Sequence, residues 1–370
     1  MSRIPDQAKR KPETKMIDKY QADSERIGRQ LIDMAAALKK ENGVCLIFLH
    51  KSVDGDCVGS ACGLCEALRR IGVEAYVAMP EELPENMNFL GVSGLLFDVT
   101  SDTDVAKAFR ENGMVFDRKF TRAIAVDISE SDRMGACGEY FDRCPDKIII
   151  DHHASVSLRA DNMWIDPEAS SASELVYYVI CSTAKILGRP VSDLADTLAA
   201  SCLMAGIVTD TGRFTYKNTH PETLISAGEL MSLGGDISSV CYNLFDLKKM
   251  SKFKLSAAAR SNAEFLAGGK FVISVVPYSM FEEYGAGSDG VDDVVSALRD
   301  VDGVEVAIVL RELENGEIRA NVRSNDGFNS AAFAGLYGGG GHLRAAGFSV
   351  RGRKIDALAD EVKERVEKIL

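Results

Sequence analysis

Residues 44–56, VCLIFLHKSVDGD, set the pattern from which the fold can be predicted. The first six are wholly apolar, which is typical of a short strand buried on both faces of a sheet. A polar segment rich in glycine and aspartate, 50–60, follows directly and is interpreted as a loop. Two later apolar runs also end in polar clusters: 123–126 precedes Asp127, and 148–150 precedes Asp151-His152-His153.

Apolar strands alternate with helical patterns through the first two thirds of the chain. Strands are predicted at 44–49, 74–79, 123–126 and 147–150, and helices at 21–40, 61–71, 173–187 and 191–208. This alternation is typical of crossover units and a mostly parallel, twisted sheet. The stretch 93–120 shows no clear period and is interpreted as a helical excursion. We therefore predict an α/β fold.

A smaller α+β unit is predicted in the last third. Charged helical sequence around 247–252 leads to Gly268-Gly269, which is interpreted as a bridge between domains. Asn315-Gly316 is typical of a hairpin turn. Strands are predicted at 271–276, 305–310 and 318–322, and helices at 291–299, 330–336 and 355–370.

The composition limits the class of protein. The chain has 370 residues, 46% of them hydrophobic, and a formal net charge of -12. These values fit two ordinary cores and exclude a disordered or fibrous protein. With no membrane-length apolar run or signal peptide and an odd number of cysteines, we expect reduced thiols, a cytoplasmic protein and no membrane partner. The acidity argues against an extended surface for long duplex nucleic acid, but not against a nucleic acid bound at one local site.

The polar clusters at the strand ends are expected to converge, because the carboxyl ends of parallel strands share one edge of the sheet. A further carboxylate, Asp210, ends the apolar helical run 204–208. Each aspartate alone is more typical of a cap or turn. Together, such carboxylates would repel one another unless cations neutralised them, and with two imidazoles they suit a pair of Mn²⁺ or similar ions.

A pair of divalent ions is typical of phosphate-ester hydrolysis, in which it activates a water and polarises the phosphoryl oxygens. Asp127, alone after its own strand, is a natural bridging carboxylate, and Asp151 is better placed to orient a histidine ring. A structural zinc site is not favoured. Cys62 and Cys65 lie within one predicted helix, and we interpret them as core residues.

A run of four glycines, 338–341, precedes His342. Backbone without side chains lets N–H groups approach an anion closely. Together with Arg323, at the end of a predicted strand, this glycine loop predicts a second surface that contacts phosphate or base. A purely architectural role for the glycines is the alternative.

These motifs together resemble the DHH phosphoesterases, in the two-domain group with a DHH-associated C-terminal domain. Within it the chain is most similar to the bacterial oligoribonucleases that degrade very short RNA and dephosphorylate 3'-phosphoadenosine 5'-phosphate (PAP). The motifs that carry the resemblance are His50-x3-Asp54-x-Asp56 with Gly59-Ser60, Asp127, Asp151-His152-His153, 206–214 and Gly338–His342. Val53 and Ala172 depart from the proline and threonine common in the family.

The resemblance implies a role for each motif. One Mn²⁺ would be held by His50 and Asp54, the other by Asp56, His152 and Asp210, with Asp127 as the bridge. His153 would face the scissile phosphate, and Asp151 would orient a histidine ring. The substrate-binding residues of the C-terminal domain would be Arg323, Ser324, Gly339, Gly340, Gly341 and His342.

The resemblance also implies four parts of the chain: a polar tail (1–24), a DHH catalytic domain (25–245), a linker helix (246–269) and a substrate-binding domain (270–370). The expected substrates are short RNAs, cut to 5'-mononucleotides. Linear dinucleotides such as pApA, and PAP, are alternatives, and a nucleotide-binding module without catalysis is a remote one. A homodimer is an assembly that remains to be tested.

Overall fold

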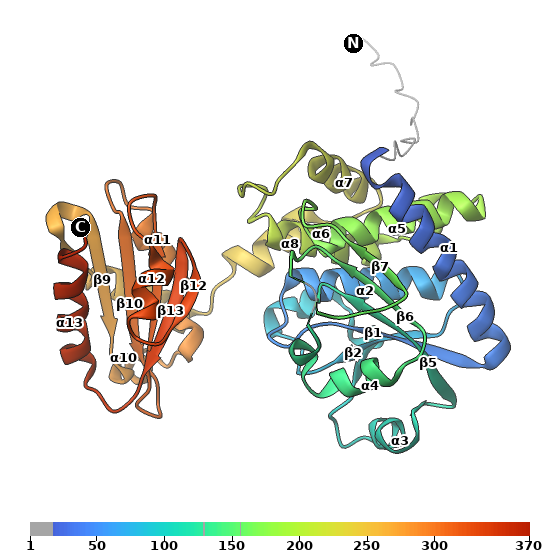
Figure 1. Cartoon of the computed structure of the whole chain (residues 1–370), viewed down its shortest axis with the longest axis horizontal. Helices are drawn as coiled ribbons and strands as arrows, with labels where there is room; N and C mark the ends of the chain where they lie inside the picture. The colour runs from blue at the N-terminus through green and yellow to red at the C-terminus, as the bar shows by residue number, and fades with distance from the viewer. Residues whose placement is uncertain (1–17, 129, 156) are drawn as a thin grey trace, which may run out of the picture. The chain divides into compact units, whose positions relative to one another are not determined.

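The computed structural model describes residues 18–128, 130–155 and 157–370. The chain forms two compact units that divide between Leu247 and Lys248, as Figure 1 shows. Each unit has its own sheet, so the predicted α/β class is confirmed. Within the described residues, no helix has the length and apolar character needed to span a bilayer.

The sheet of the first unit has the strand order β3-β2-β1-β5-β6-β7, and all neighbours along this path are parallel. The central strand β1 is buried at every residue, which explains its uninterrupted apolar sequence. A short strand, β4, pairs antiparallel with β5. The bounds are β1 Gly43–Phe48, β2 Ala75–Met79, β3 Leu96–Asp98, β4 Met114–Val115, β5 Arg118–Val126, β6 Lys147–Asp151 and β7 Asn162–Ile165.

Helices cover both faces of this sheet (Figure 1). Alternate residues of β1 divide between the two cores: Ile47 packs with α1, α2, α5 and α6, whereas Phe48 packs with α3 and α4. The bounds are α1 Asp18–Glu41, α2 Gly55–Arg70, α3 Asp104–Asn112, α4 Gly138–Arg143, α5 Ala172–Leu187, α6 Thr197–Asp210, α7 Pro221–Ser232 and α8 Ile237–Cys241.

Helices α2 and α6 pack backbone to backbone at two glycines. A Cβ atom on Gly59 would overlap the carbonyl oxygen of Cys202 and lie 2.9 Å from the backbone nitrogen of Gly206. The two helices can approach this closely only without side chains at the crossing. This contact fixes the start of α2 relative to the end of α6.

We therefore expect Gly59→Ala to lower the free energy of unfolding by about 1–3 kcal/mol, because the added methyl group forces the helices apart. Chemical denaturation measures the change. Gly228→Ala in α7 is the matched control, because a Cβ there meets no atom within 4 Å. It should leave stability unchanged or raise it slightly. Equal stability of the two variants would contradict the close packing of α2 and α6.

The second unit contains a mixed sheet of order β12-β13-β11-β10-β9-β8, in which only β9 and β10 run parallel. Helices α9 and α11 pack on one face, and α12 and α13 pack on the other. The strands are β8 Glu264–Leu266, β9 Phe271–Val276, β10 Val306–Glu312, β11 Ile318–Ser324, β12 Gly340–His342 and β13 Ala345–Val350. The helices are α9 Met250–Ser261, α10 Tyr278–Tyr284, α11 Val294–Arg299, α12 Ser330–Gly335 and α13 Ile355–Glu367.

Two predicted elements are wrong in type. The segment 50–60 is a loop only in its first half, because Asp54 caps α2 by accepting the backbone N–H groups of Asp56 and Cys57 at 3.1 and 3.0 Å. The stretch 93–120 is not a helical excursion. It contains β3, α3 and the β4–β5 hairpin, and β5 starts five residues before the predicted strand.

Two predicted boundaries also differ from the packing. Helix α1 begins inside the predicted tail 1–24, where the buried Tyr20 ring lies 4.8 Å from the ring of Tyr178. Helix α9 occupies the predicted linker 246–269, but its Leu255 and Ala259 are buried in a core of the second unit. Most of that segment is therefore part of the second unit.

Candidate functional site

Six predicted metal-binding residues meet at the carboxyl edge of the first sheet, although they come from four regions of the chain. Three directly follow strands of the sheet, two lie at the start of α2, and one ends α6. In chain order they are His50, Asp54, Asp56, Asp127, His152 and Asp210. They meet because the carboxyl ends of the parallel strands lie at one edge of the sheet.

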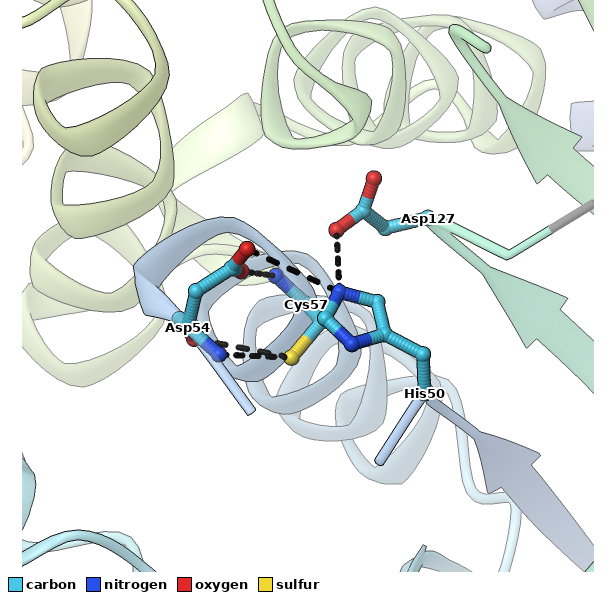
Figure 2. A group of neighbouring side chains, drawn as sticks. All are labelled: His50, Asp54, Cys57 and Asp127. Atoms are coloured by element: carbon cyan, nitrogen blue, oxygen red, sulfur yellow. Dashed lines mark hydrogen bonds and ion pairs between the residues drawn. The ribbon is translucent and has the colours of Figure 1, made fainter. Parts of the chain in front are cut away.

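The first cluster contains His50, Asp54, Cys57 and Asp127, whose potential ligand atoms lie within 4.8 Å of one another. Figure 2 shows the His50 ring between two carboxylates. His50 Nε2 lies 3.6 Å from Asp54 Oδ2 and 3.3 Å from Asp127 Oδ2. The other ring nitrogen, Nδ1, lies 2.8 Å from the carbonyl oxygen of Lys51, which fixes the ring orientation.

Cys57 is a member of this cluster that the sequence did not predict. Its Sγ accepts the backbone N–H of Asp54 at 3.3 Å, as part of the cap of α2 (Figure 2). The available signal was the three-residue spacing from Asp54, which is the spacing of a capping box. The thiol is fully buried, and burial raises its pKa to about 12.

The second cluster contains Asp56, His152 and Asp210. His152 Nε2 lies 3.1 Å from Asp210 Oδ2 and 3.7 Å from Asp56 Oδ2. It also lies 3.4 Å from Asp127 Oδ1. The two oxygens of Asp127 therefore face two different histidines, one from each cluster.

Asp56 is fully buried, and backbone groups at the start of α5 hold it. Its carboxylate accepts the N–H of Ala172 at 2.6 Å and that of Ser173 at 2.9 Å. The positive end of the helix dipole favours the carboxylate there. Burial nevertheless raises the pKa of Asp56, and the nearby charges of Asp210 and Asp127 raise it further.

The protonation equilibria of the site show how crowded its charges are. Burial favours the neutral form of His152, but hydrogen bonds with Asp127 and Asp210 outweigh burial and raise its pKa to about 12. Burial likewise opposes the charge on Asp127, but hydrogen bonds with His152 and His50 lower its pKa. The pKa of Asp210 is raised, chiefly by burial.

These residues fit a pair of divalent cations. Asp127 is only 2% exposed, and its buried Oδ1 lies 3.4 Å from His152 Nε2 and 3.6 Å from His153 Nδ1, which is too far for a strong hydrogen bond. The carboxylates beside it repel one another, and bound cations would remove this repulsion. Mixed imidazole and carboxylate donors are typical of Mn²⁺ and similar ions.

Asp151 supports both histidines that follow it. Its Oδ1 accepts the backbone N–H of His152 at 2.7 Å and that of His153 at 3.2 Å, and it lies 2.8 Å from His153 Nδ1. The hydrogen bond with Asp151 raises the pKa of His153, whose side chain is 36% exposed. Asp151 thus orients the His153 ring through Nδ1, and the partly exposed ring lies beside Asp127.

The predicted substrate residues lie on the second unit, and the sheet register relates them. Arg323 on β11 and His342 on β12 both pair with Ala345 on β13, so their side chains share one face in one row. Ser324 does not belong to that row. It is buried, and its hydroxyl donates to the carbonyl oxygen of Phe328 at 2.8 Å.

The predicted glycine loop is partly a strand. Gly340, Gly341 and His342 form the edge strand β12, whose backbone pairs with β13. A Cβ on Gly339 would overlap the carbonyl oxygen of Gly347, and Gly341 has φ +143° beside Ala346. Close backbone packing therefore requires glycine at 339 and 341, whereas a Cβ on Gly340 would meet no atom within 4 Å.

Two family models match the chain, one in each unit. A family model described as the DHH family, N-terminal domain, matches residues 44–207, and the DHHA1 domain model matches residues 268–368. The chain is 31% identical to the bifunctional oligoribonuclease and PAP phosphatase NrnA of Thermus thermophilus, over 91% of this chain and 93% of that protein. It is 28% identical to the Bacillus subtilis protein of the same name, over 82% and 89%.

A solved structure shares the fold. An exopolyphosphatase-related protein from Bacteroides fragilis superposes with a TM-score of 0.77 at 22% sequence identity. The match covers 92% of this chain and 97% of that one.

Proposed function

This chain belongs to the DHH family, with a DHHA1 domain, and from that premise we propose that it hydrolyses very short RNAs to 5'-mononucleotides in a Mn²⁺-dependent reaction. Family membership makes it a phosphoric ester hydrolase. The substrate, the metal and the roles of individual residues are the proposal. Relatives named as oligoribonucleases, which match over most of their length, support the choice of substrate.

The observation that carries the proposal is the placement of Asp127. Its Oδ2 faces His50 at 3.3 Å and its Oδ1 faces His152 at 3.4 Å. We assign one cation to His50 and Asp54 and the other to Asp56, His152 and Asp210, with Asp127 shared. When bound, such a pair supplies an activated water and neutralises charge on the phosphoryl oxygens.

The chain's own residues supply orientation and charge. Asp151 holds the His153 ring through Nδ1, so that the rest of the imidazole can donate to a phosphoryl oxygen as negative charge develops. In the second unit, Arg323 and His342 share a row and would bind the nucleotide beside the cut. Ser324 would support this row from within the core rather than contact the substrate.

PAP is the second candidate substrate, because the relatives' name includes PAP phosphatase activity. Linear dinucleotides such as pApA fit the same residues. Rates for RNAs of two, three, five and twenty nucleotides, pApA and PAP, each with Mn²⁺ or Mg²⁺, would rank the candidates. We expect the fastest turnover on the shortest RNAs with Mn²⁺. Absence of turnover on every short substrate would contradict the proposal and favour a non-catalytic nucleotide-binding module.

We also propose that the protein works in the cytoplasm, because all nine cysteines are free, as in a reducing compartment. A homodimer remains a prediction. Sedimentation of the purified chain would test it.

His342→Ala is expected to raise KM for a dinucleotide about ten- to a hundredfold, because it removes a hydrogen bond to a charged substrate. The value of kcat and the bound metal should change little, since His342 lies on the second unit. Leu343→Ala is the matched control, because the neighbouring residue Leu343 is also exposed. Loss of bound metal in His342→Ala would contradict the assignment of metal binding to the first unit and of substrate binding to the second.

A further inference from the structure

Tyr216 lies in the turn that follows Asp210, between α6 and α7, and its side chain is 61% exposed. Exposed aromatic side chains are common on proteins, so exposure alone does not indicate a function. The way in which this ring is held is more informative.

The ring rests on the backbone of Gly212. A Cβ atom on Gly212 would overlap the Tyr216 ring, so the ring occupies the space that a side chain would fill. The backbone nitrogen of Tyr216 donates to the carbonyl oxygen of Thr211 at 3.0 Å. One side of the ring is therefore supported by the main chain, while most of its surface stays open to solvent.

The turn that holds the ring is strained. Gly212, Arg213 and Phe214 have φ values of +52°, +61° and +64° in succession. The left-handed region costs a residue other than glycine about 1–2 kcal/mol. The strain is maintained by local bonds: Arg213 N–H donates to the carbonyl oxygen of Val208 at 2.8 Å. Such strain tends to occur at functional sites, where a side chain must be held in place.

The same turn is tied to the metal centre. Asn218 Nδ2 donates to the carbonyl oxygen of Asp210 at 3.1 Å and to that of Ser170 at 2.9 Å. Asp210 lies at the start of the turn, and Asn218 brings its end back to the same residue. The Tyr216 ring is thus held in a fixed relation to a proposed metal-binding carboxylate.

We propose that Tyr216 is a stacking platform for a nucleobase of the substrate whose phosphate lies at the metal centre. The proposal rests on the proposed function and adds a binding site for the base. Stacking suits an enzyme for short RNAs of any sequence, because every base has a π-face. A ring already fixed on one side loses little entropy when a base covers the other.

Two cations lie beside the ring in this turn: Arg213 is engaged elsewhere, whereas Lys217 is exposed and directly follows Tyr216. Arg213 Nη1 pairs with Asp246 at 3.2 Å, and its guanidinium lies 4.9 Å from the centre of the Phe245 ring. This pairing neutralises its charge. The turn therefore offers a ligand an aromatic ring next to one lysine, which suits a nucleobase together with a phosphate of the same nucleic acid.

The test compares Tyr216→Leu, which removes the ring, with Tyr216→Phe, which keeps it. For a dinucleotide we expect Tyr216→Leu to raise KM about tenfold or more, with kcat changed far less, and Tyr216→Phe to behave like the original protein. Phe116→Leu is the matched control, because Phe116 is also exposed, at 57%, but precedes β5 at the opposite edge of the sheet. Two abasic dinucleotides, one without the first base and one without the second, identify the base that stacks. For the dinucleotide that lacks this base, Tyr216→Leu and the original protein should have the same KM.

An unchanged KM in Tyr216→Leu would contradict the proposal that Tyr216 stacks on a base. An equal rise in KM in Tyr216→Phe would also contradict it. So would a loss of thermal stability or of bound metal in Tyr216→Leu that accounts for the change, because the ring would then be structural. Quenching of a 2-aminopurine dinucleotide measures stacking without turnover. If the original protein hydrolyses no dinucleotide, the proposed function fails, while the quenching still decides whether Tyr216 stacks on a base.

Discussion

Replacing Asp127 with asparagine is expected to lower kcat by about 10³-fold or more and to reduce the amount of bound metal. The residue is almost fully buried, and its two oxygens face His50 and His152. Asparagine keeps the shape but presents a neutral amide to two cations that need a shared anion. Loss of a central electrostatic group typically costs two to three orders of magnitude in rate.

The measurements are steady-state rates and metal content after gel filtration in limiting Mn²⁺. Asp146→Asn is the matched control, because Asp146 lies just before β6, at the opposite edge of the sheet, with its side chain half exposed. It should keep both rate and metal. A near-normal rate in Asp127→Asn would show that the bridge is assigned to the wrong carboxylate.

Gly206→Ala should lower activity strongly by a different route, through displacement of Asp56. A Cβ on Gly206 would overlap both Asp56 Oδ1 and the hydroxyl oxygen of Ser173. Because the N–H groups of Ala172 and Ser173 hold Asp56 in place, the carboxylate cannot move without losing them. We expect a loss of about 10²-fold or more in kcat, as for a misplaced catalytic group.

Gly59→Ala separates this effect from simple destabilisation. Both substitutions add a methyl group between α2 and α6, but only the one at 206 reaches Asp56. At a temperature where both variants are folded, Gly59→Ala should lose less activity and metal than Gly206→Ala, because its methyl group meets the backbone of α6 and not the carboxylate of Asp56. If the two variants lost activity in proportion to their stability, the carboxylate would not be the cause.

The sequence predicts best those features that burial imposes on side chains. An unbroken apolar run such as 44–49 is compatible with few structures other than a central strand, and β1 is buried throughout. Polar residues directly after such strands must lie at one edge, which is why Asp127 and Asp151-His152-His153 could be predicted to converge. The position of Asp210 at the end of α6 was also predicted from the apolar run before it.

Features governed by the backbone were harder to predict. The edge strand β7 has only four residues, too few for a period to be evident. Strand β12 consists of two glycines and a histidine, which carry no strand pattern, so its pairing with β13 could not be predicted. Cys57 cannot be predicted as a member of the site because the glycine- and aspartate-rich sequence 50–60 indicates a loop, whereas α2 begins at Gly55. The left-handed run 212–214 depends on backbone angles that side-chain patterns do not specify.

The distance along the chain between the parts of the site has a consequence for biosynthesis. The groups that hold Asp56 lie at Ala172 and Ser173, and Asp210 is later still. At about 5–20 residues per second, a ribosome needs roughly 8–30 s to make the segment from Asp56 to Asp210. During that interval β1 has been translated but lacks part of its apolar covering. The nascent chain, rather than the finished enzyme, is therefore the form most exposed to aggregation and most in need of a chaperone.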